Sequence, residues 1–289
     1  MKLGIIDIGS NSVRTMKAES DEAGISLRYA PKRTHTTRLA EGLIETGCLS
    51  EERMALSLDV IRSFYYECIA EDRRVFAYAT SATRDAKNRT DFTSRITALP
   101  GLSLSVLSGE EEATLAFLVA GGENVGLIDI GGGSTQISTA TFRKSFPMGC
   151  VRARDIAPDD SIDTVREKLL PVLDSLFTFP DAVPARWVGI GGTITTLGAL
   201  TQRLCVYDRG IVNNTVLTSD GLTALLKRLS DMGDDARSKM PLLSKRHNVI
   251  LQGGTILLYV LGRLGIASLT VSETDGMEGF AVHVLKHLL

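Results

Sequence analysis

Two phrases in this chain could bind phosphate. Each contains a short apolar run that ends in an aspartate and is followed by a glycine- and serine-rich turn. The first phrase, residues 4–12, reads GIIDIGSNS, and the second, residues 126–134, reads GLIDIGGGS. Glycine permits backbone angles closed to other residues and leaves no Cβ in the way of a ligand. Successive N–H groups in such a turn can converge on an anion. The aspartate could hold a divalent cation or orient a water molecule.

The duplication makes phosphate binding a more specific interpretation than one phrase would allow. If only one phrase were present, an apolar strand followed by a glycine-rich turn would be an ordinary tight turn as often as a phosphate-binding loop. Asp7 and Asp129 are a domain's length apart, so each phrase could open its own domain. Two such loops facing one another would clamp a phosphate chain and its metal.

The composition is typical of a soluble globular protein. The chain has 289 residues, enough for two domains, with 44% hydrophobic and 23% charged residues. A net charge of −2 provides no basic footprint, so nucleic acid is not an expected partner. The four cysteines lack metal-binding spacing, which favours free thiols in a reducing cytoplasm. We expect no leader segment, because residues 1–3 lead directly into the first predicted strand. We expect no membrane contact, because the apolar stretch 249–264 is short and interrupted by polar and glycine residues.

Hydrophobic periodicity and turn residues predict the same order of elements, βββαβαβα, in both halves. In the first half, we expect strands at 2–7, 12–19, 24–35, 74–79 and 102–107, with helices from 51, 91 and 109. In the second half, we expect strands at 125–130, 135–140, 142–148, 187–190 and 267–271, with helices at 164–176, 193–204, 220–231, 246–264 and 277–288. This order predicts an α/β protein of two ribonuclease-H-like domains, 1–122 and 123–289, with an active-site cleft between them.

The acidic run 110–112 contains the best candidate for a catalytic base. Such runs usually form a solvated face, and Ser108 with Glu111 fits a helix-capping box. Glu112 instead shares a helix face with Leu115 and Ala116, so it should be the least solvated of the three glutamates. A carboxylate within reach of a water molecule can act as a general base.

Five phrases together make a family resemblance. They are DIGSNS at 7–12, ATSATRDA at 79–86, SGEEEA at 108–113, DIGGGST at 129–135 and MGCVR at 148–152. In this order and spacing, the chain resembles the exopolyphosphatase / guanosine pentaphosphate phosphatase family of the actin-like superfamily, in its short two-domain form. The resemblance extends over the whole chain.

The resemblance implies hydrolysis of phosphoanhydride bonds in polyphosphate or guanosine pentaphosphate, with Mg²⁺ or Mn²⁺. It implies that Glu112, Asp129 and Arg84 are catalytic, and that Asp7, Asp129 and Glu112 lie near the metal. The phosphate-binding residues that it implies are Ser10, Asn11, Ser12, Thr80, Ser81, Gly131, Gly132, Gly133, Ser134, Thr135, Gly192 and Thr193. Arginine suits this chemistry because its planar fork of donors matches phosphate oxygens. Without that role, Arg84 would be an exposed turn residue.

Three positions depart from the family's pattern. Gln136 stands where the family usually has glutamate, Met277 where it often has arginine, and Asn248 where an acidic residue is common. These changes are expected to affect metal affinity and rate, because an amide carries no charge and cannot act as a base. One hypothesis is that Asp275 or Glu278 returns carboxylate charge to the cleft in place of Gln136.

Three functions therefore compete. The first is a cytoplasmic hydrolase of polyphosphate, of shorter chains because the chain stops after two core domains, or of a guanosine polyphosphate. The second is a sensor that binds the same ligands but has lost turnover, as Gln136 and Met277 suggest. The third is a kinase of the same superfamily, which the phrases at 10–12 and 108–113 disfavour. The apolar helices could support a homodimer.

Overall fold

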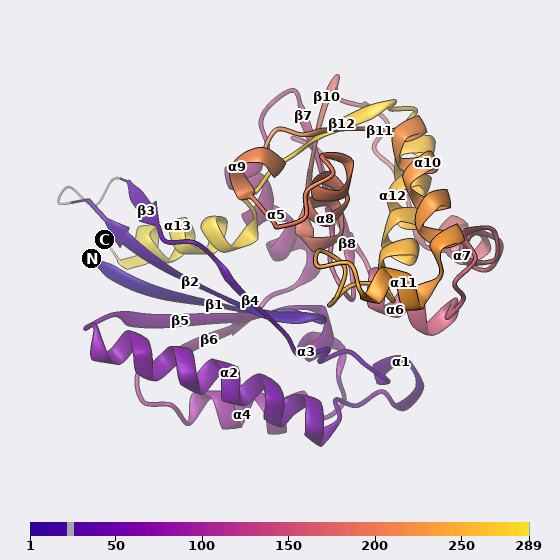
Figure 1. Ribbon diagram of the computed structural model, residues 1–289. Helices are drawn as coiled ribbons and strands as arrows, with labels where there is room; N and C mark the ends of the chain where they lie inside the picture. Colours follow the sequence, from indigo (N-terminus) through magenta and orange to yellow (C-terminus); the bar gives the residue numbers. More distant parts are fainter. Residues whose placement is uncertain (22–25, 289) are drawn as a thin grey trace. The chain divides into compact units, whose positions relative to one another are not determined.

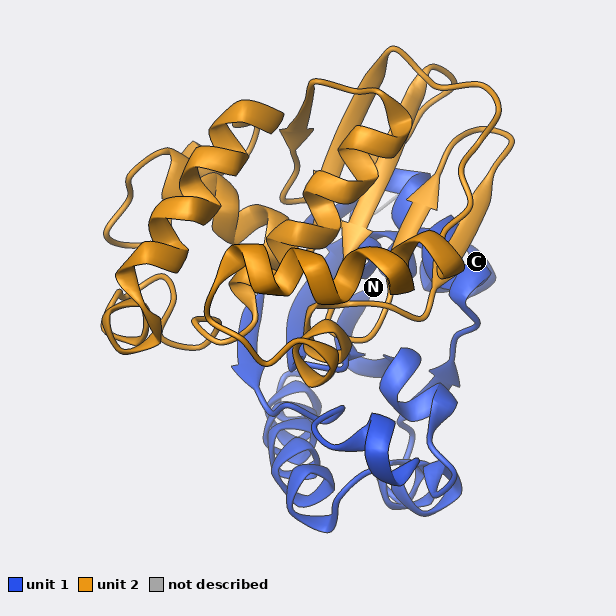
Figure 2. Cartoon of the chain, turned by 90° about the vertical axis from the view of Figure 1, so that its right-hand side faces the viewer, with its two compact units in different colours: residues 1–119, 276–289 blue, residues 120–275 orange. Residues whose placement is uncertain are grey.

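The computed structural model describes residues 1–21 and 26–288 and divides the chain into two compact units. Unit 1 comprises Met1–Val119 and Gly276–Leu289, and unit 2 comprises Ala120–Asp275 (Figure 2). The chain leaves unit 1 close to the boundary expected at 122. However, the C-terminal segment that was assigned to the second domain belongs to unit 1, and this part of the prediction is corrected.

Unit 1 contains a six-stranded sheet. Its strands are β1 (Lys2–Ile8), β2 (Ser12–Ser20), β3 (Leu27–Tyr29), β4 (Arg33–Thr36), β5 (Arg74–Ala79) and β6 (Ser103–Val106). They follow the order β3-β2-β1-β5-β6, with β4 also paired to β2, and β1, β5 and β6 run parallel. The single strand expected over 24–35 is two strands, β3 and β4, separated by a segment that contains Pro31, which cannot donate to a ladder. Residues 24 and 25 of that prediction lie outside the described residues.

The helices of unit 1 cover both faces of its sheet. They are α1 (Leu43–Thr46), α2 (Glu51–Ala70), α3 (Ser81–Asp85), α4 (Arg89–Thr97), α5 (Gly109–Ala120) and α13 (Gly276–Leu288). Helices α2 and α4 lie on one side of the sheet and α13 on the other (Figure 1). Ser50 caps α2 by accepting a hydrogen bond from the Arg53 N–H.

Helix α13 belongs to unit 1 because its apolar face completes that unit's core. Met277 and Phe280 are buried in one cluster with Leu3 and Leu115. Gly279 lets α13 approach α5 closely, since a Cβ at this position would overlap the Leu115 carbonyl. Periodicity predicted this helix but could not say which sheet it would cover.

Unit 2 repeats the strand order of unit 1. Its strands are β7 (Val125–Ile130), β8 (Thr135–Ser138), β9 (Arg143–Phe146), β10 (Arg186–Ile190), β11 (Val216–Thr218) and β12 (Ser268–Val271). The sheet order is β11-β12-β10-β7-β8-β9, with β7, β10 and β12 parallel and β8 and β9 antiparallel. The repeated α/β fold is therefore confirmed. The sequence did not predict β11, which adds an antiparallel edge strand beside β12.

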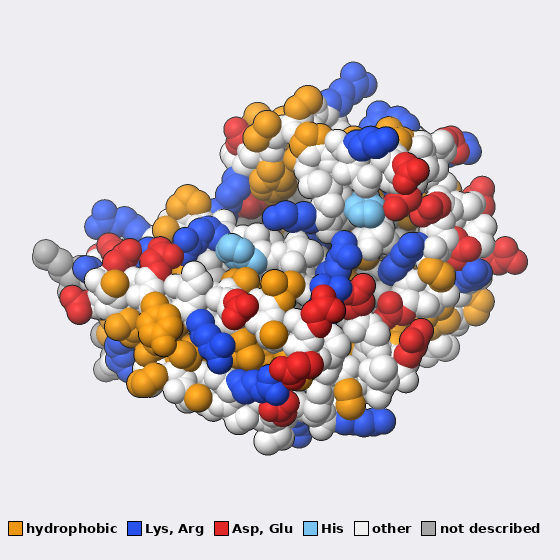
Figure 3. Space-filling model, turned by 60° about the horizontal axis from the view of Figure 1, so that its bottom comes forward, with side chains coloured by type: hydrophobic (Ala, Val, Ile, Leu, Met, Phe, Trp, Pro, Cys, Tyr) orange, Lys and Arg blue, Asp and Glu red, His pale blue; other side chains and the backbone are white. Residues whose placement is uncertain are grey.

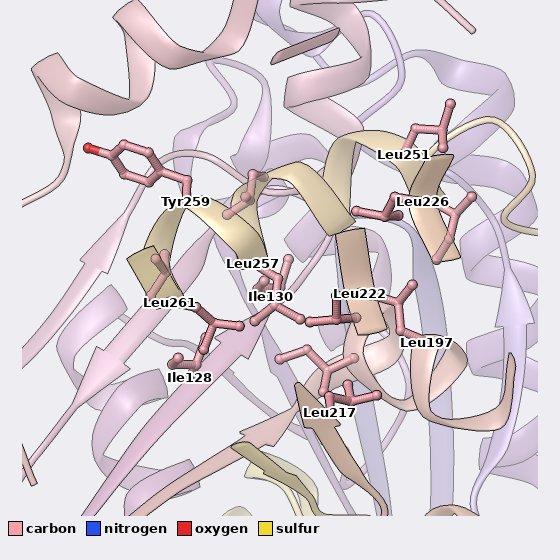
Figure 4. Close-up of a cluster of buried hydrophobic side chains, with 14 of the residues drawn as sticks. Ile128, Ile130, Leu197, Leu217, Leu222, Leu226, Leu251, Leu257, Tyr259 and Leu261 are labelled. Atoms are coloured by element: carbon pink, nitrogen blue, oxygen red, sulfur yellow. The ribbon is translucent and has the colours of Figure 1, made fainter. Parts of the chain in front are cut away.

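Helix α12 lies at the centre of unit 2. The helices are α6 (Cys150–Ile156), α7 (Ile162–Leu176), α8 (Gly191–Thr201), α9 (Arg209–Val212), α10 (Ser219–Met232), α11 (Asp234–Ser238) and α12 (Ile250–Leu264). Leu257 of α12 packs with Ile130 of β7 and Leu222 of α10 in the core shown in Figure 4. The interpretation of 249–264 as a buried helix is confirmed. Within the described ranges, no helix is both long and apolar enough to cross a bilayer.

Candidate active site

In each unit, the predicted phosphate phrases gather at one edge of the sheet. The carboxyl ends of parallel strands meet at the same edge, where α/β proteins commonly bind ligands. In unit 1, β1, β5 and β6 lead into the segments 9–11, 80–84 and 107–112. In unit 2, β7, β10 and β12 lead into the segments 131–134, 191–193 and 272–275. Each unit therefore has its own candidate phosphate-binding edge.

The first phosphate loop is joined to the start of α3. The Gly9 N–H donates to the Ser12 carbonyl at 3.1 Å, which closes the turn. The hydroxyls of Ser10 and Ser81 share a hydrogen bond of 2.9 Å, and the Thr80 N–H donates to the Ile8 carbonyl at 3.2 Å. The structure thus brings together Ser10, Asn11, Ser12, Thr80 and Ser81, and all five are buried.

Arg14 neutralises Asp7 at the end of β1. The two residues are opposite one another in the β1–β2 ladder. Arg14 Nε donates to Asp7 Oδ2 at 2.8 Å, and Arg14 Nη2 contacts the same oxygen. Because a guanidinium engages this buried carboxylate, Asp7 anchors β2 beside the loop, and the contact counts against its predicted role as a metal ligand.

Arg84 and Glu112, predicted from different phrases, lie side by side in unit 1. Arg84 Nη1 is 3.6 Å from Glu112 Oε2 and donates to the Leu107 carbonyl at 2.8 Å. The side chains of Arg84 and Glu112 are 23% and 19% exposed, so Arg84 is not a fully solvated turn residue. A cation that can bind phosphate therefore stands next to the candidate base.

The neighbouring glutamate has the structural role that its spacing predicts. The Ser108 N–H donates to Glu111 Oε2 at 2.7 Å, and the Glu111 N–H donates to Ser108 Oγ at 3.2 Å. Hydrogen bonding of the Glu111 carboxylate to the backbone and side chain of Ser108 holds the pKa of Glu111 below its usual value. Of the three glutamates at the start of α5, only Glu112 is partly buried, as expected.

The second phosphate loop has the same turn as the first. The Gly131 N–H donates to the Ser134 carbonyl at 3.0 Å. The N–H groups of Cys150 and Val151, at the start of α6, donate to the carbonyls of Gly131 and Gly132 at 3.0 and 2.8 Å. The phrase at 148–152 therefore supports the loop through its backbone. Ser134 and Thr135 are buried, and the Thr135 hydroxyl donates to the Met148 carbonyl.

Asp129 faces an amide where Asp7 faces an arginine. Gln136 is opposite Asp129 in the β7–β8 ladder, the position that Arg14 has beside Asp7 in unit 1. Gln136 Nε2 donates to the hydroxyls of Ser134 and Ser145 at 3.0 and 3.1 Å. Gln136 Oε1 is buried, and no hydrogen-bond donor reaches it from the described residues. A carboxylate and an uncommitted amide oxygen are thus neighbours at this edge.

Arg246 is a candidate site residue that the sequence reasoning missed. A Cβ on Gly192, at the start of α8, would lie 2.7 Å from Arg246 Nη1 and closer still to Nη2. Arg246 therefore lies against Gly192, one of the predicted phosphate-binding residues. Helix N-termini attract anions, and a guanidinium there strengthens that preference. Nothing in the local sequence distinguishes Arg246 from Lys245 or His247, so only the fold could identify it.

Two of the unusual C-terminal residues have structural roles in unit 1. Met277 is fully buried in the core, so it fills space. Glu278 forms an ion pair of 2.7 Å with Lys32, and both side chains are almost fully buried. Glu278 is therefore committed to Lys32, which counts against the hypothesis that it replaces the charge missing at Gln136. Asp275 is buried at the end of unit 2, and its metal role stays a proposal.

The donor set in unit 2 fits a divalent cation carried by phosphate. Among residues 1–21 and 26–288, no group of three His, Cys, Asp or Glu side chains is placed to hold a metal ion. Mg²⁺ needs no such cage, because one or two carboxylates, substrate phosphates and water usually complete its shell. Asp129 and the uncommitted Gln136 oxygen are hard oxygen donors of this kind.

Comparison with known proteins places the chain among phosphatases. Residues 18–288 match the model of the Ppx/GppA phosphatase family. Exopolyphosphatase 2 of Mycobacterium tuberculosis is 32% identical to this chain, covering 97% of it and 98% of its own length. Exopolyphosphatase 1 of Mycobacterium bovis is 28% identical, covering 99% and 88%.

Solved structures show the same two-domain fold. A family member from Aquifex aeolicus superimposes with a TM-score of 0.79 at 30% identity, covering 99% of this chain and 98% of its own. An exopolyphosphatase-like protein has a TM-score of 0.90 over the full length of both chains, and its 24% identity supports the fold alone. The chain belongs to the Ppx/GppA phosphatase family.

Proposed function

We propose that this protein hydrolyses the terminal phosphoanhydride bond of short inorganic polyphosphate and of guanosine pentaphosphate. The pairing of Arg84 with Glu112 beside the first phosphate loop supports this proposal most directly. Phosphoryl transfer needs a group that orients the nucleophile and a cation that neutralises the phosphate oxygens. Both are present at one sheet edge of unit 1.

In the proposed reaction, Glu112 accepts a proton from a water molecule as the water oxygen attacks the terminal phosphorus. The bond from phosphorus to the bridging oxygen breaks, and the bridging oxygen leaves with the shortened chain. Arg84 neutralises charge on the transferred group, since a guanidinium matches phosphate oxygens. In unit 2, the N–H groups of residues 131–135 and of the start of α8, together with Arg246, form a second group that can bind phosphate. Orthophosphate is the second product.

A divalent cation, Mg²⁺ or Mn²⁺, would be held by Asp129 and the Gln136 amide oxygen. When bound, it would neutralise phosphate charge. A neutral amide contributes less charge to this site than a glutamate would. The same observation favours a second candidate function, a sensor that binds polyphosphate or a guanosine polyphosphate with little turnover.

The test is orthophosphate release from polyphosphates of defined length and from guanosine pentaphosphate, with Mg²⁺, with Mn²⁺ and with a chelator. We expect metal-dependent release that is fastest on short chains. On the face shown in Figure 3, basic and acidic side chains are intermixed, which does not suit a long polyanion. A preference for very long polymers would contradict the chain-length proposal. Binding of either ligand without release would support the sensor.

Replacing Gln136 with glutamate should make the protein more dependent on Mg²⁺ for stability. The variant places a second carboxylate opposite Asp129 at a buried position, where like charges repel unless a cation lies between them. We expect Mg²⁺ to raise the Tm of Gln136→Glu by about 2–4 °C more than that of the wild type, the equivalent of roughly 1 kcal/mol. Thermal unfolding with and without Mg²⁺ measures this difference.

The matched control exchanges the two groups, with Asp129→Asn combined with Gln136→Glu. This double variant retains one carboxylate and one amide, so its metal-free stability should exceed that of Gln136→Glu alone. Equal Mg²⁺ shifts in the wild type and Gln136→Glu would mean that the cation does not bind at this pair.

A further inference from the structure

Arg38 has a left-handed backbone conformation that no helix end explains. Its φ is +52°, which costs a residue with a side chain roughly 1–2 kcal/mol. In the described part of the chain, the other non-glycine residues with positive φ are Asp72, Arg203 and Asn214. Each of these lies two residues beyond a helix, where a left-handed residue is an ordinary way to end it. Arg38 follows strand β4 instead.

Backbone hydrogen bonds fasten Arg38 to the first phosphate loop. The N–H groups of Thr37 and Arg38 both donate to the Asn11 carbonyl, at 3.1 and 2.9 Å. The Ala40 N–H donates to the Ser10 carbonyl at 2.9 Å. The residues on both sides of Arg38 are buried, and Arg38 itself is half-buried. The strained residue is therefore held at the loop that the function uses.

Among residues 1–21 and 26–288, no acidic side chain pairs with the charge of Arg38. Arg14 is bonded to Asp7, and Arg84 lies between Glu112 and the Leu107 carbonyl. The Arg38 side chain, in contrast, makes no hydrogen bond or ion pair with any described residue. A half-buried guanidinium that pairs with no described residue can pair with an anion bound at the loop.

We propose that Arg38 binds a phosphate group of the substrate at the first phosphate loop. This inference rests on the proposed function and adds a residue that sets substrate affinity. The strained backbone is held beside the loop by its hydrogen bonds to Asn11, and strained residues often lie at functional sites. The planar fork of arginine can bond two phosphate oxygens at once.

The decisive variant is Arg38→Gly, because glycine adopts a φ of +52° without strain. The loop and its backbone hydrogen bonds should persist, and the Tm should equal or exceed that of the wild type. We expect the KM for tripolyphosphate to rise roughly 10- to 100-fold, the loss of a charged hydrogen bond, with a smaller change in kcat. Arg38→Lys should recover part of the affinity, because it restores the charge without the fork.

Calorimetric titration with tripolyphosphate separates this inference from the proposed function. If the wild type releases no phosphate, weaker binding to Arg38→Gly would still support a phosphate site at Arg38. Arg38→Gln tests the same loss if the glycine variant does not fold. Arg62→Gln, which removes an exposed arginine from α2, is the control for net charge. A KM and a Kd within twofold of the wild type in both Arg38→Gly and Arg38→Gln would overturn the proposal.

Discussion

Replacing Glu112 with glutamine is expected to lower the kcat of phosphate release by about 10²- to 10⁴-fold, the usual contribution of a general base. Glutamine has nearly the same shape but cannot accept the proton of the attacking water. Glu112 is partly buried and 3.6 Å from Arg84, so the substitution should leave the fold and the arginine in place. Initial rates at saturating tripolyphosphate with Mg²⁺ measure the effect, and KM should change far less than kcat.

Glu111→Gln is the matched control, because Glu111 precedes Glu112 and accepts the capping bond from Ser108. Its loss should lower stability and leave kcat near the wild-type value. The pKa of Glu111 is lowered in the folded protein from 4.5, so its contribution to stability is present above that pH and is lost as the pH falls further. An equal fall in kcat for both variants would indicate that the charge at the start of α5 matters, and not a base at Glu112. An active Glu112→Gln variant would exclude Glu112 as the base.

Gly191→Ala is expected to reduce both stability and kcat/KM. The φ of Gly191 is +87°, which an alanine adopts only at a cost of roughly 1–2 kcal/mol. The added Cβ would also overlap Asp129 Oδ1 and lie 2.9 Å from the Ile130 carbonyl, so Asp129 must move. A shift of about 1 Å in a catalytic group can cost 10²-fold in rate, and we expect a loss of at least that size. Phosphate-release kinetics measure kcat/KM, and thermal unfolding measures the stability.

Two further glycine variants separate the displacement of Asp129 from other effects of adding a Cβ. In Gly192→Ala, the Cβ meets the end of the flexible Arg246 side chain, so the Tm should change little while the KM rises. In Gly262→Ala, nothing lies near the new Cβ, and the helix should gain up to about 1 kcal/mol without a change in activity. Wild-type kcat/KM in Gly191→Ala would show that the position of Asp129 has no part in the reaction.

Much of the fold could be predicted from the sequence because the deciding signals are local. Strand and helix periods, the Ser108–Glu111 capping box and the glycine turns at 9–12 and 131–134 each depend on a few adjacent residues. The repeated strand order follows from those elements, and it placed the phosphate loops at one sheet edge of each unit. The partial burial of Glu112 could also be predicted, because its apolar helix face separates it from the neighbouring glutamates.

Tertiary structure alone decided which distant residues meet at those edges. Strand register places Arg14 opposite Asp7 and Gln136 opposite Asp129, and it thereby makes the two loops electrostatically different. The approach of Arg246 to Gly192 depends on contacts between segments far apart in the sequence. Such pairings leave no local pattern, because a polar residue in a loop looks the same whether it faces solvent or a ligand. Periodicity likewise could not show that the last helix returns to unit 1, since an apolar helix face fits any sheet that exposes a complementary surface.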